Sequence, residues 1–205
     1  MRYPVPDLPA GTRRESETEV EKSRFITWIC HAPDVASVTT LLAEARRVHP
    51  NASHHCSAFI AGAPGEQNAI GFSDDGEPGG TAGRPMFQVL DGAGLGQVGC
   101  VVTRYFGGTK LGTGGLARAY SQAVSQALAE LPLHHVTERT ALRLKVGFAG
   151  EAEARTWLES LAVPVTAVEY AADGVILTAG WPRDTAIDLG PLEARLRGNL
   201  ALVDT

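Results

Sequence analysis

The chain has 205 residues and a formal net charge of −5, with 44% hydrophobic and 20% charged residues. This composition excludes extensive disorder and leaves room for one large domain or two modest ones. The negative net charge excludes a protein that binds polyanions over its whole surface, so any nucleic-acid contact must come from a local patch. The three cysteines are odd in number and form no CxxC pair, which favours reduced thiols in the cytoplasm.

The predicted elements of the first half begin after residues 1–22, which we expect to be an exposed arm because they are proline-rich and then acidic at alternate positions. Residues 23–133 are expected to form one domain. Its strands are predicted near 23–30, 54–61 and 98–104, and its helices near 34–48, 81–91 and 113–131. Asp34 and Thr81 are the candidate caps of the first two helices.

The second half, residues 138–205, predicts strands and helices in the order β-α-β-β-α-β, which is the ferredoxin-like pattern. Pro132 and the pair His134-His135 mark the expected domain boundary. The apolar runs are too short for a transmembrane helix, and the first residues lack the apolar region of a secretory signal, so no membrane contact is expected.

Glycine and charge are unevenly distributed. Of the 23 glycines, 14 fall between Gly71 and Gly115, and no Asp or Glu occurs from Gly92 to Ala129. Glycine lowers helix and strand stability by roughly 0.5–1 kcal/mol relative to alanine, so this density indicates backbone that approaches something closely or adopts positive φ. Residues 71–120 are therefore where we expect function.

A glycine-rich loop lies between the predicted strand that ends at Arg104 and the helix that begins near Thr113. Backbone N–H groups at such a helix N-terminus, with basic side chains nearby, suit phosphate or carboxylate. Its spacing is not that of a P-loop, and it could instead be a turn that packs strand on helix. We expect an anion-binding surface made of Arg104, Gly107, Gly108, Lys110, Gly112, Gly114, Gly115 and Arg118.

The acidic motif Asp74, Asp75 and Glu77 has two readings. Its carboxylates could hold a divalent cation, or they could cap the helix near Thr81 and pair with Arg84 or Arg104. The second reading is favoured because no EF-hand spacing and no companion His accompany the motif. We expect this motif and the basic loop to face each other across one surface.

His54 and Cys56 share one face of a predicted strand and could belong to a metal site or a nucleophile pair, although a buried thiol is the commoner outcome. Neither a metal nor a cofactor is expected. The GxGxxG match at Gly94–Gly99 is interpreted as a turn, because a strand and not a helix follows it.

Four long motifs together resemble the IMPACT family, specifically its bacterial two-domain, YigZ-type members. They are ASHHCSAF from Ala52, SDDGEP from Ser73, GTAGRP from Gly80 and RYFGGTKLGTGGLARAY from Arg104. They contain the residues His54, Cys56, Thr81, Gly83, Tyr105, Phe106 and Tyr120. The resemblance covers about residues 20–131, and the second half resembles the C-terminal domain of these members more weakly.

The resemblance implies an α+β protein. Its N-terminal domain would be a two-layer α/β domain like domain IV of elongation factor G, a ribosomal-protein-like fold, and its C-terminal domain would be ferredoxin-like, akin to domain V of that factor. Eukaryotic members regulate translation by binding the activator of a stress kinase. No catalytic residue is carried over from the bacterial members.

The leading hypothesis is a cytoplasmic regulator of translation that binds RNA or the ribosome through the glycine-rich basic surface. An enzyme acting on a phosphorylated small molecule, with the acidic motif holding a cation, is the alternative from a second class. A protein-interaction module is the third. Salt dependence separates the first from the third, because phosphate contacts release counterions.

Overall fold

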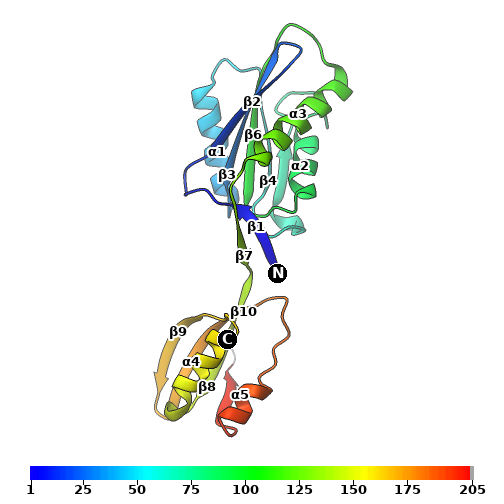
Figure 1. Cartoon of the computed structure of the whole chain (residues 1–205). Helices are drawn as coiled ribbons and strands as arrows, with labels where there is room; N and C mark the ends of the chain where they lie inside the picture. The colour runs from blue at the N-terminus through cyan, green and yellow to red at the C-terminus, as the bar shows by residue number, and fades with distance from the viewer. Residues whose placement is uncertain (204–205) are drawn as a thin grey trace. The chain divides into compact units, whose positions relative to one another are not determined.

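The structure is a computed structural model that describes residues 1–203, and it divides into two compact units (Figure 1). One unit comprises Arg2–Val136, and the other comprises the chain from Thr137 onward together with Met1. Each unit has its own hydrophobic core.

The first unit is built on a five-stranded antiparallel sheet with the strand order β2-β3-β6-β4-β5. A separate two-stranded sheet joins β1 and β7. The elements are β1 (Arg2–Pro6), β2 (Arg14–Val20), β3 (Ser23–His31), α1 (Val35–Val48), β4 (His54–Ile60), η1 (Gln67–Ala69), β5 (Ile70–Ser73), α2 (Gly83–Gly92), β6 (Val98–Tyr105), α3 (Gly112–Ala129) and β7 (Leu133–Thr137).

Helices cover both faces of this sheet, so the unit has three layers and not the two that we predicted. Figure 1 shows α1 on one side of the sheet and α2 and α3 on the other. Side chains of Phe25 and Ile29 pack in the core cluster with α2 and α3, whereas Trp28 and Cys30 pack in the cluster with α1. Alternate residues of a strand point to opposite faces, and β3 is buried at nearly every position. A strand that is apolar on both faces needs a cover on both.

The prediction of an exposed arm at residues 1–22 is wrong. Val5 of β1 is fully buried, and β2 pairs with β3 along its whole length. The alternating glutamates lie on the exposed face of β2, while Thr18 lies on the covered face. The charged pattern is therefore that of a half-buried edge strand.

The second unit contains the predicted order of strands and helices in one antiparallel sheet, β11-β8-β10-β9. Its core includes Leu144, Leu158, Leu177 and the stacked pair Trp157 and Trp181. The elements are β8 (Arg139–Val146), η2 (Phe148–Gly150), α4 (Glu151–Ser160), β9 (Val165–Ala171), β10 (Gly174–Pro182), α5 (Gly190–Arg195) and β11 (Leu200–Val203).

Candidate functional site

Asp74 organises the turn that joins β5 to α2. Its Oδ1 accepts hydrogen bonds from the backbone N–H groups of Ala82 (2.9 Å) and Gly83 (2.8 Å), and its Oδ2 accepts one from Gly80 (2.7 Å). Burial alone would raise the pKa of Asp74, but the three N–H donors outweigh it and hold the pKa below its ordinary value. Asp74 therefore supplies the cap of α2.

Thr81 does not cap this helix, contrary to the sequence prediction. Its hydroxyl donates to the carbonyl of Pro78 (2.6 Å), and Ala82 occupies the N-cap position. The carboxylate of Asp74 reaches these N–H groups from six to nine residues away in sequence, which agrees with the reading in which the acidic motif caps this helix.

Asp75 connects the acidic turn to β4 and to α1. Its Oδ2 accepts from the backbone N–H of His55 (2.6 Å), and its Oδ1 accepts from the guanidinium of Arg46 (2.9 Å). The ring of His54 donates through Nδ1 to the backbone carbonyl of Asp75 (2.8 Å). The turn residue Asp75 itself has a φ of 44°, and Gly76 follows with 86°.

Glu77 is the centre of a buried polar network. Its Oε1 accepts from the Arg104 guanidinium (2.7 Å) and from the Tyr120 hydroxyl (2.8 Å). Both side chains of the ion pair are nearly inaccessible, with 3% of Glu77 and 6% of Arg104 exposed. The second Arg104 nitrogen donates to Ser23 Oγ (3.3 Å). A buried charge pair of this kind ties β6 to the acidic turn and α3.

Cys56 borders this network and is buried. Its sulfur lies 3.1 Å from the Asp74 carbonyl and 3.3 Å from the Tyr120 hydroxyl. Burial raises the pKa of the Cys56 thiol to about 12, far above the range in which a reactive thiolate forms.

Each carboxylate of the acidic motif is bonded to protein donors, so these groups do not form an open cation site.

The start of the glycine-rich loop is held against the β2–β3 turn. The N–H of Phe106 donates to Ser53 Oγ (3.2 Å), and the N–H of Gly107 donates to Ser23 Oγ (3.1 Å). A Cβ on Gly107 would lie 2.0 Å from the carbonyl carbon of Lys22, so only glycine fits. Gly107 is therefore a packing residue, and it brings Lys22 beside the loop, which the sequence did not indicate.

The far end of the loop and the start of α3 are open. Gly108 and Gly112 have φ values of 89° and 70°, which favour glycine. The first turn of α3 contains no acidic residue, and no side chain caps it. Lys110 and Arg118 are exposed, and neither has an ion pair or hydrogen bond with any residue in the range 1–203. Arg118 lies over this turn, with Nη1 3.4 Å from where a Cβ on Gly114 would be.

The structure thus separates the predicted site residues into two groups. Arg104 was expected on the anion-binding surface, but it is buried and committed to Glu77. Arg84 takes no part in the acidic turn's ion pairs. Lys110, Arg118 and the glycines of the α3 first turn form an exposed basic surface, which we call the loop surface and to which Lys22 is added.

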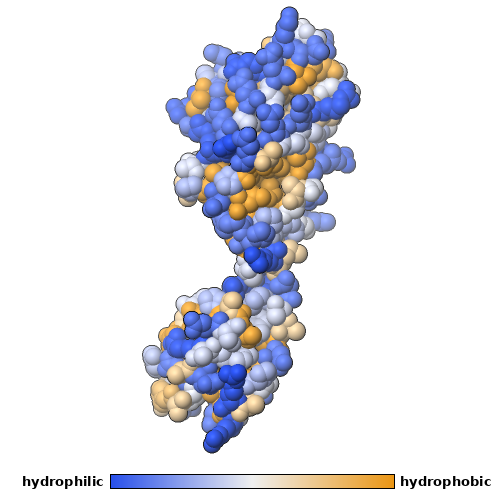
Figure 2. Space-filling view, in the orientation of Figure 1, coloured by the Kyte–Doolittle hydropathy of each residue, from blue (hydrophilic) through white to orange (hydrophobic). Residues whose placement is uncertain are grey.

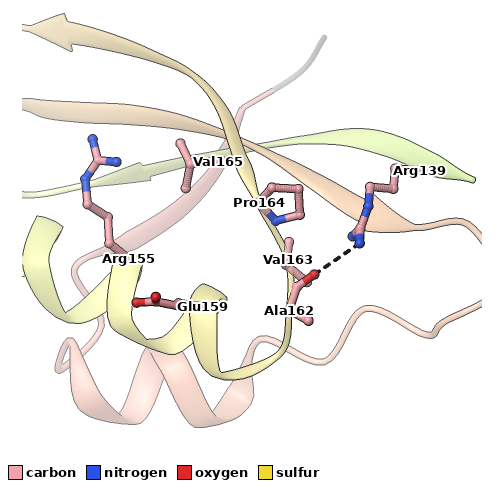
Figure 3. Close-up of a pocket in the computed structure, with 7 residues that line it drawn as sticks. All are labelled: Arg139, Arg155, Glu159, Ala162, Val163, Pro164 and Val165. Atoms are coloured by element: carbon pink, nitrogen blue, oxygen red, sulfur yellow. Dashed lines mark hydrogen bonds between the residues drawn. The ribbon is translucent and has the colours of Figure 1, made fainter. Parts of the chain in front are cut away.

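Two cavities lie away from these residues. One of about 450 Å³ in the second unit is bordered by Arg139 and Arg155 (Figure 3). Arg139 donates to the carbonyls of Gly180 and Ala162, and Arg155 pairs with Glu151, so both guanidinium groups already have protein partners. The other, of about 680 Å³, lies between residues 10–13 and α1. Neither contains a residue that the sequence predicted for the site.

Comparison with known proteins decides the family. Residues 21–128 match the Impact N-terminal domain, which is more than half of the chain. The protein belongs to the IMPACT family. It is 48% identical over 127 residues to "IMPACT family member YigZ" of Escherichia coli, a match that covers 62% of each chain. It is 43% identical over 131 residues to "IMPACT family member YvyE" of Bacillus subtilis, covering 63% of this chain and 58% of the relative.

The match to these curated relatives thus spans less than two thirds of their length. A solved structure described as that of a hypothetical protein extends the similarity to the whole chain. It has a TM-score of 0.69 and 36% identity, and the match covers 100% of this chain and 97% of that one. None of the helices within residues 1–203 has the length and apolar character needed to span a membrane.

Proposed function

We propose that this protein is a cytoplasmic, translation-associated regulator that binds RNA or the ribosome through the loop surface. The observation that carries the proposal is that two cations at the uncapped N-terminus of α3, Lys110 and Arg118, have no ion-pair partner among residues 1–203. The positive end of a helix dipole repels basic side chains, so this arrangement does not stabilise the fold. It does suit an anion, which would accept hydrogen bonds from the free N–H groups and neutralise both cations.

The charge around this surface supports a polyanionic ligand. The net charge of the chain is −5, yet no acidic residue occurs between Gly92 and Ala129. Figure 2 shows a largely hydrophilic surface at the end of the first unit that carries the β2–β3 turn and the β6–α3 loop. A local basic surface on an acidic protein favours docking in one orientation over non-specific coating of nucleic acid.

Family membership supplies the link to translation. The proposal extends to the fold, with the first unit like domain IV of elongation factor G and the second unit ferredoxin-like. An enzyme that uses the acidic motif to hold a cation is less well supported, because Asp74, Asp75 and Glu77 are all bonded to protein donors.

The test is co-sedimentation of the full chain with ribosomes and with purified ribosomal RNA across a salt series. The proposal predicts retention at low salt that falls steeply as salt rises, because each phosphate contact releases a counterion. Retention that does not change with salt would instead favour a protein partner. Loss of retention at every salt concentration would contradict the proposal.

A further inference from the structure

Phe106 is an aromatic side chain presented to solvent by a backbone that cannot move freely. Half of it (51%) is exposed. Its own N–H is bonded to Ser53 Oγ, and the next N–H, of Gly107, is bonded to Ser23 Oγ. Because Gly107 also lies against the backbone of Lys22 without room for a Cβ, the Phe106–Gly107 segment is fixed between β2–β3 and β4.

The ring of Phe106 is also supported by a fixed side chain. The guanidinium carbon of Arg104 lies 5.6 Å from the ring centroid, within the range of a cation–π contact. Arg104 cannot swing away, because Glu77 and Ser23 hold two of its nitrogens. The ring is therefore preorganised, so a group that stacks on it would pay little entropy for ordering it.

Two lysines belong to the segments around the ring. The backbone of Lys22 packs against Gly107, the residue after Phe106, and Lys110 follows in the same loop. Within residues 1–203 both lysines are exposed and form no ion pair, and Glu21, next to Lys22 in the chain, is the exposed acidic residue of the same turn. Cations that follow a phosphate backbone, combined with an exposed aromatic ring, are the two features that bind single-stranded nucleic acids. In a double helix the faces of the bases are stacked on one another, so they cannot stack on an exposed aromatic ring.

We propose that Phe106 is a stacking platform for one unpaired base, so that the loop surface prefers single-stranded nucleic acid over a duplex. This inference rests on the proposed function and names the ligand class of the same surface. Lys22 and Lys110 contact the flanking phosphates, and the exposed face of Phe106 contacts the base.

The test compares three fluorescently labelled DNA probes, and one RNA probe, of about 12 nucleotides, within the length range of single-strand sites. The DNA probes are an oligothymidylate, an abasic strand of the same charge, and a duplex. Binding of the full chain to each is measured by fluorescence anisotropy at low salt, with an oligouridylate to compare RNA with DNA. The platform predicts that the two base-containing single strands bind about tenfold more tightly than the abasic strand.

The variant Phe106→Ala is expected to lose this tenfold preference while binding the abasic strand as the parent does. Phe106→Trp should retain the preference, since any aromatic face stacks. Phe148→Ala in η2 is the matched control, because Phe148 is 54% exposed and lies in the other unit. Melting temperatures of the variants report whether each still folds.

Equal binding of the oligothymidylate and the abasic strand by the parent protein would overturn the platform, and so would tighter binding of the duplex. This comparison needs no variant. If ribosomes are retained in a salt-sensitive way but no single strand is bound, the platform fails and the proposed function stands. If nothing is retained at any salt concentration, both fail.

Discussion

The charged groups of the acidic turn have protein partners, whereas the cations of the loop surface have none within residues 1–203. In the turn, Asp74 and Glu77 are bonded to backbone N–H groups or to a buried guanidinium. At the loop surface, Lys110 and Arg118 are exposed and have no partner among the residues that the structure describes. The comparison teaches that charge density alone does not identify a binding surface. The surface that we propose for binding is the one whose cations have no protein partner within residues 1–203.

The largest expected effect on stability is at Glu77. The change Glu77→Gln leaves the Arg104 guanidinium buried without a counter-charge, and breaking a buried ion pair costs about 3–5 kcal/mol. Urea unfolding followed by circular dichroism measures the difference. Glu169→Gln is the control: it breaks an ion pair with Arg143 in which Glu169 is 58% exposed, and the expected cost is about 1 kcal/mol or less. Equal costs for the two variants would contradict the buried network.

A smaller loss is expected for Gly107→Ala. The added methyl group would lie 2.0 Å from the Lys22 backbone, so the loop or the β2–β3 turn must shift, at a cost of about 1–3 kcal/mol. The control is Gly79→Ala, where a Cβ meets nothing within 4 Å and the unfolded chain loses entropy. Thermal melting should therefore separate the two alanine variants. Unchanged melting of Gly107→Ala would show that the loop is not held as described.

Asp74 is expected to contribute less, through the cap of α2. Asp74→Ala removes the acceptor for three N–H groups, and losing a helix cap costs about 1–2 kcal/mol. Because the folded-state pKa of Asp74 is lowered from its ordinary value of 3.8, the stabilisation from its charge is complete above that value. It is lost as the pH falls through the lower, folded-state pKa.

The pH dependence can be isolated with Asp74→Asn, which keeps an acceptor and removes the charge. The stability gap between the parent and this variant should be constant above about pH 5 and shrink below about pH 4. Chemical unfolding at a series of pH values measures it. A gap that widens on acidification would mean that the pKa is raised, contrary to the account.

Local structure was the part of the fold that could be predicted from the sequence. Asp34 was expected to cap the first helix, and its carboxylate accepts from the N–H of Ser37 as predicted. The continuous apolar run of β3 also indicated a unit with three layers, because a strand without alternating polar residues is buried on both faces. The two-layer prediction did not use that signal.

The misreading of β2 has a different cause. Its covered face presents Ser16 and Thr18, whose small polar side chains gave no apolar alternation beside the glutamates. The pairing of Arg104 with the acidic motif was one of the expected arrangements, but the sequence did not single out Glu77 among the three carboxylates, or Arg104 over Arg84. Glu77 and Arg104 are 27 positions apart, and their contact depends on how β6, the acidic turn and α3 meet. The residue types of the candidate site could be predicted from the sequence. Which of their charges are paired depends on tertiary packing.

The most direct test of the central claim is the salt dependence of ribosomal RNA binding by the double variant Lys110→Ala with Arg118→Ala. Both side chains are exposed, so thermal stability should change by no more than about 0.5 kcal/mol. If each cation contacts a phosphate, the slope of log affinity against log salt should decrease in magnitude by about two. The control is Arg195→Ala with Arg197→Ala, which removes the same charge from the end of the second unit's α5 and should leave the slope unchanged. Equal slopes for the parent and the Lys110/Arg118 variant would contradict the account.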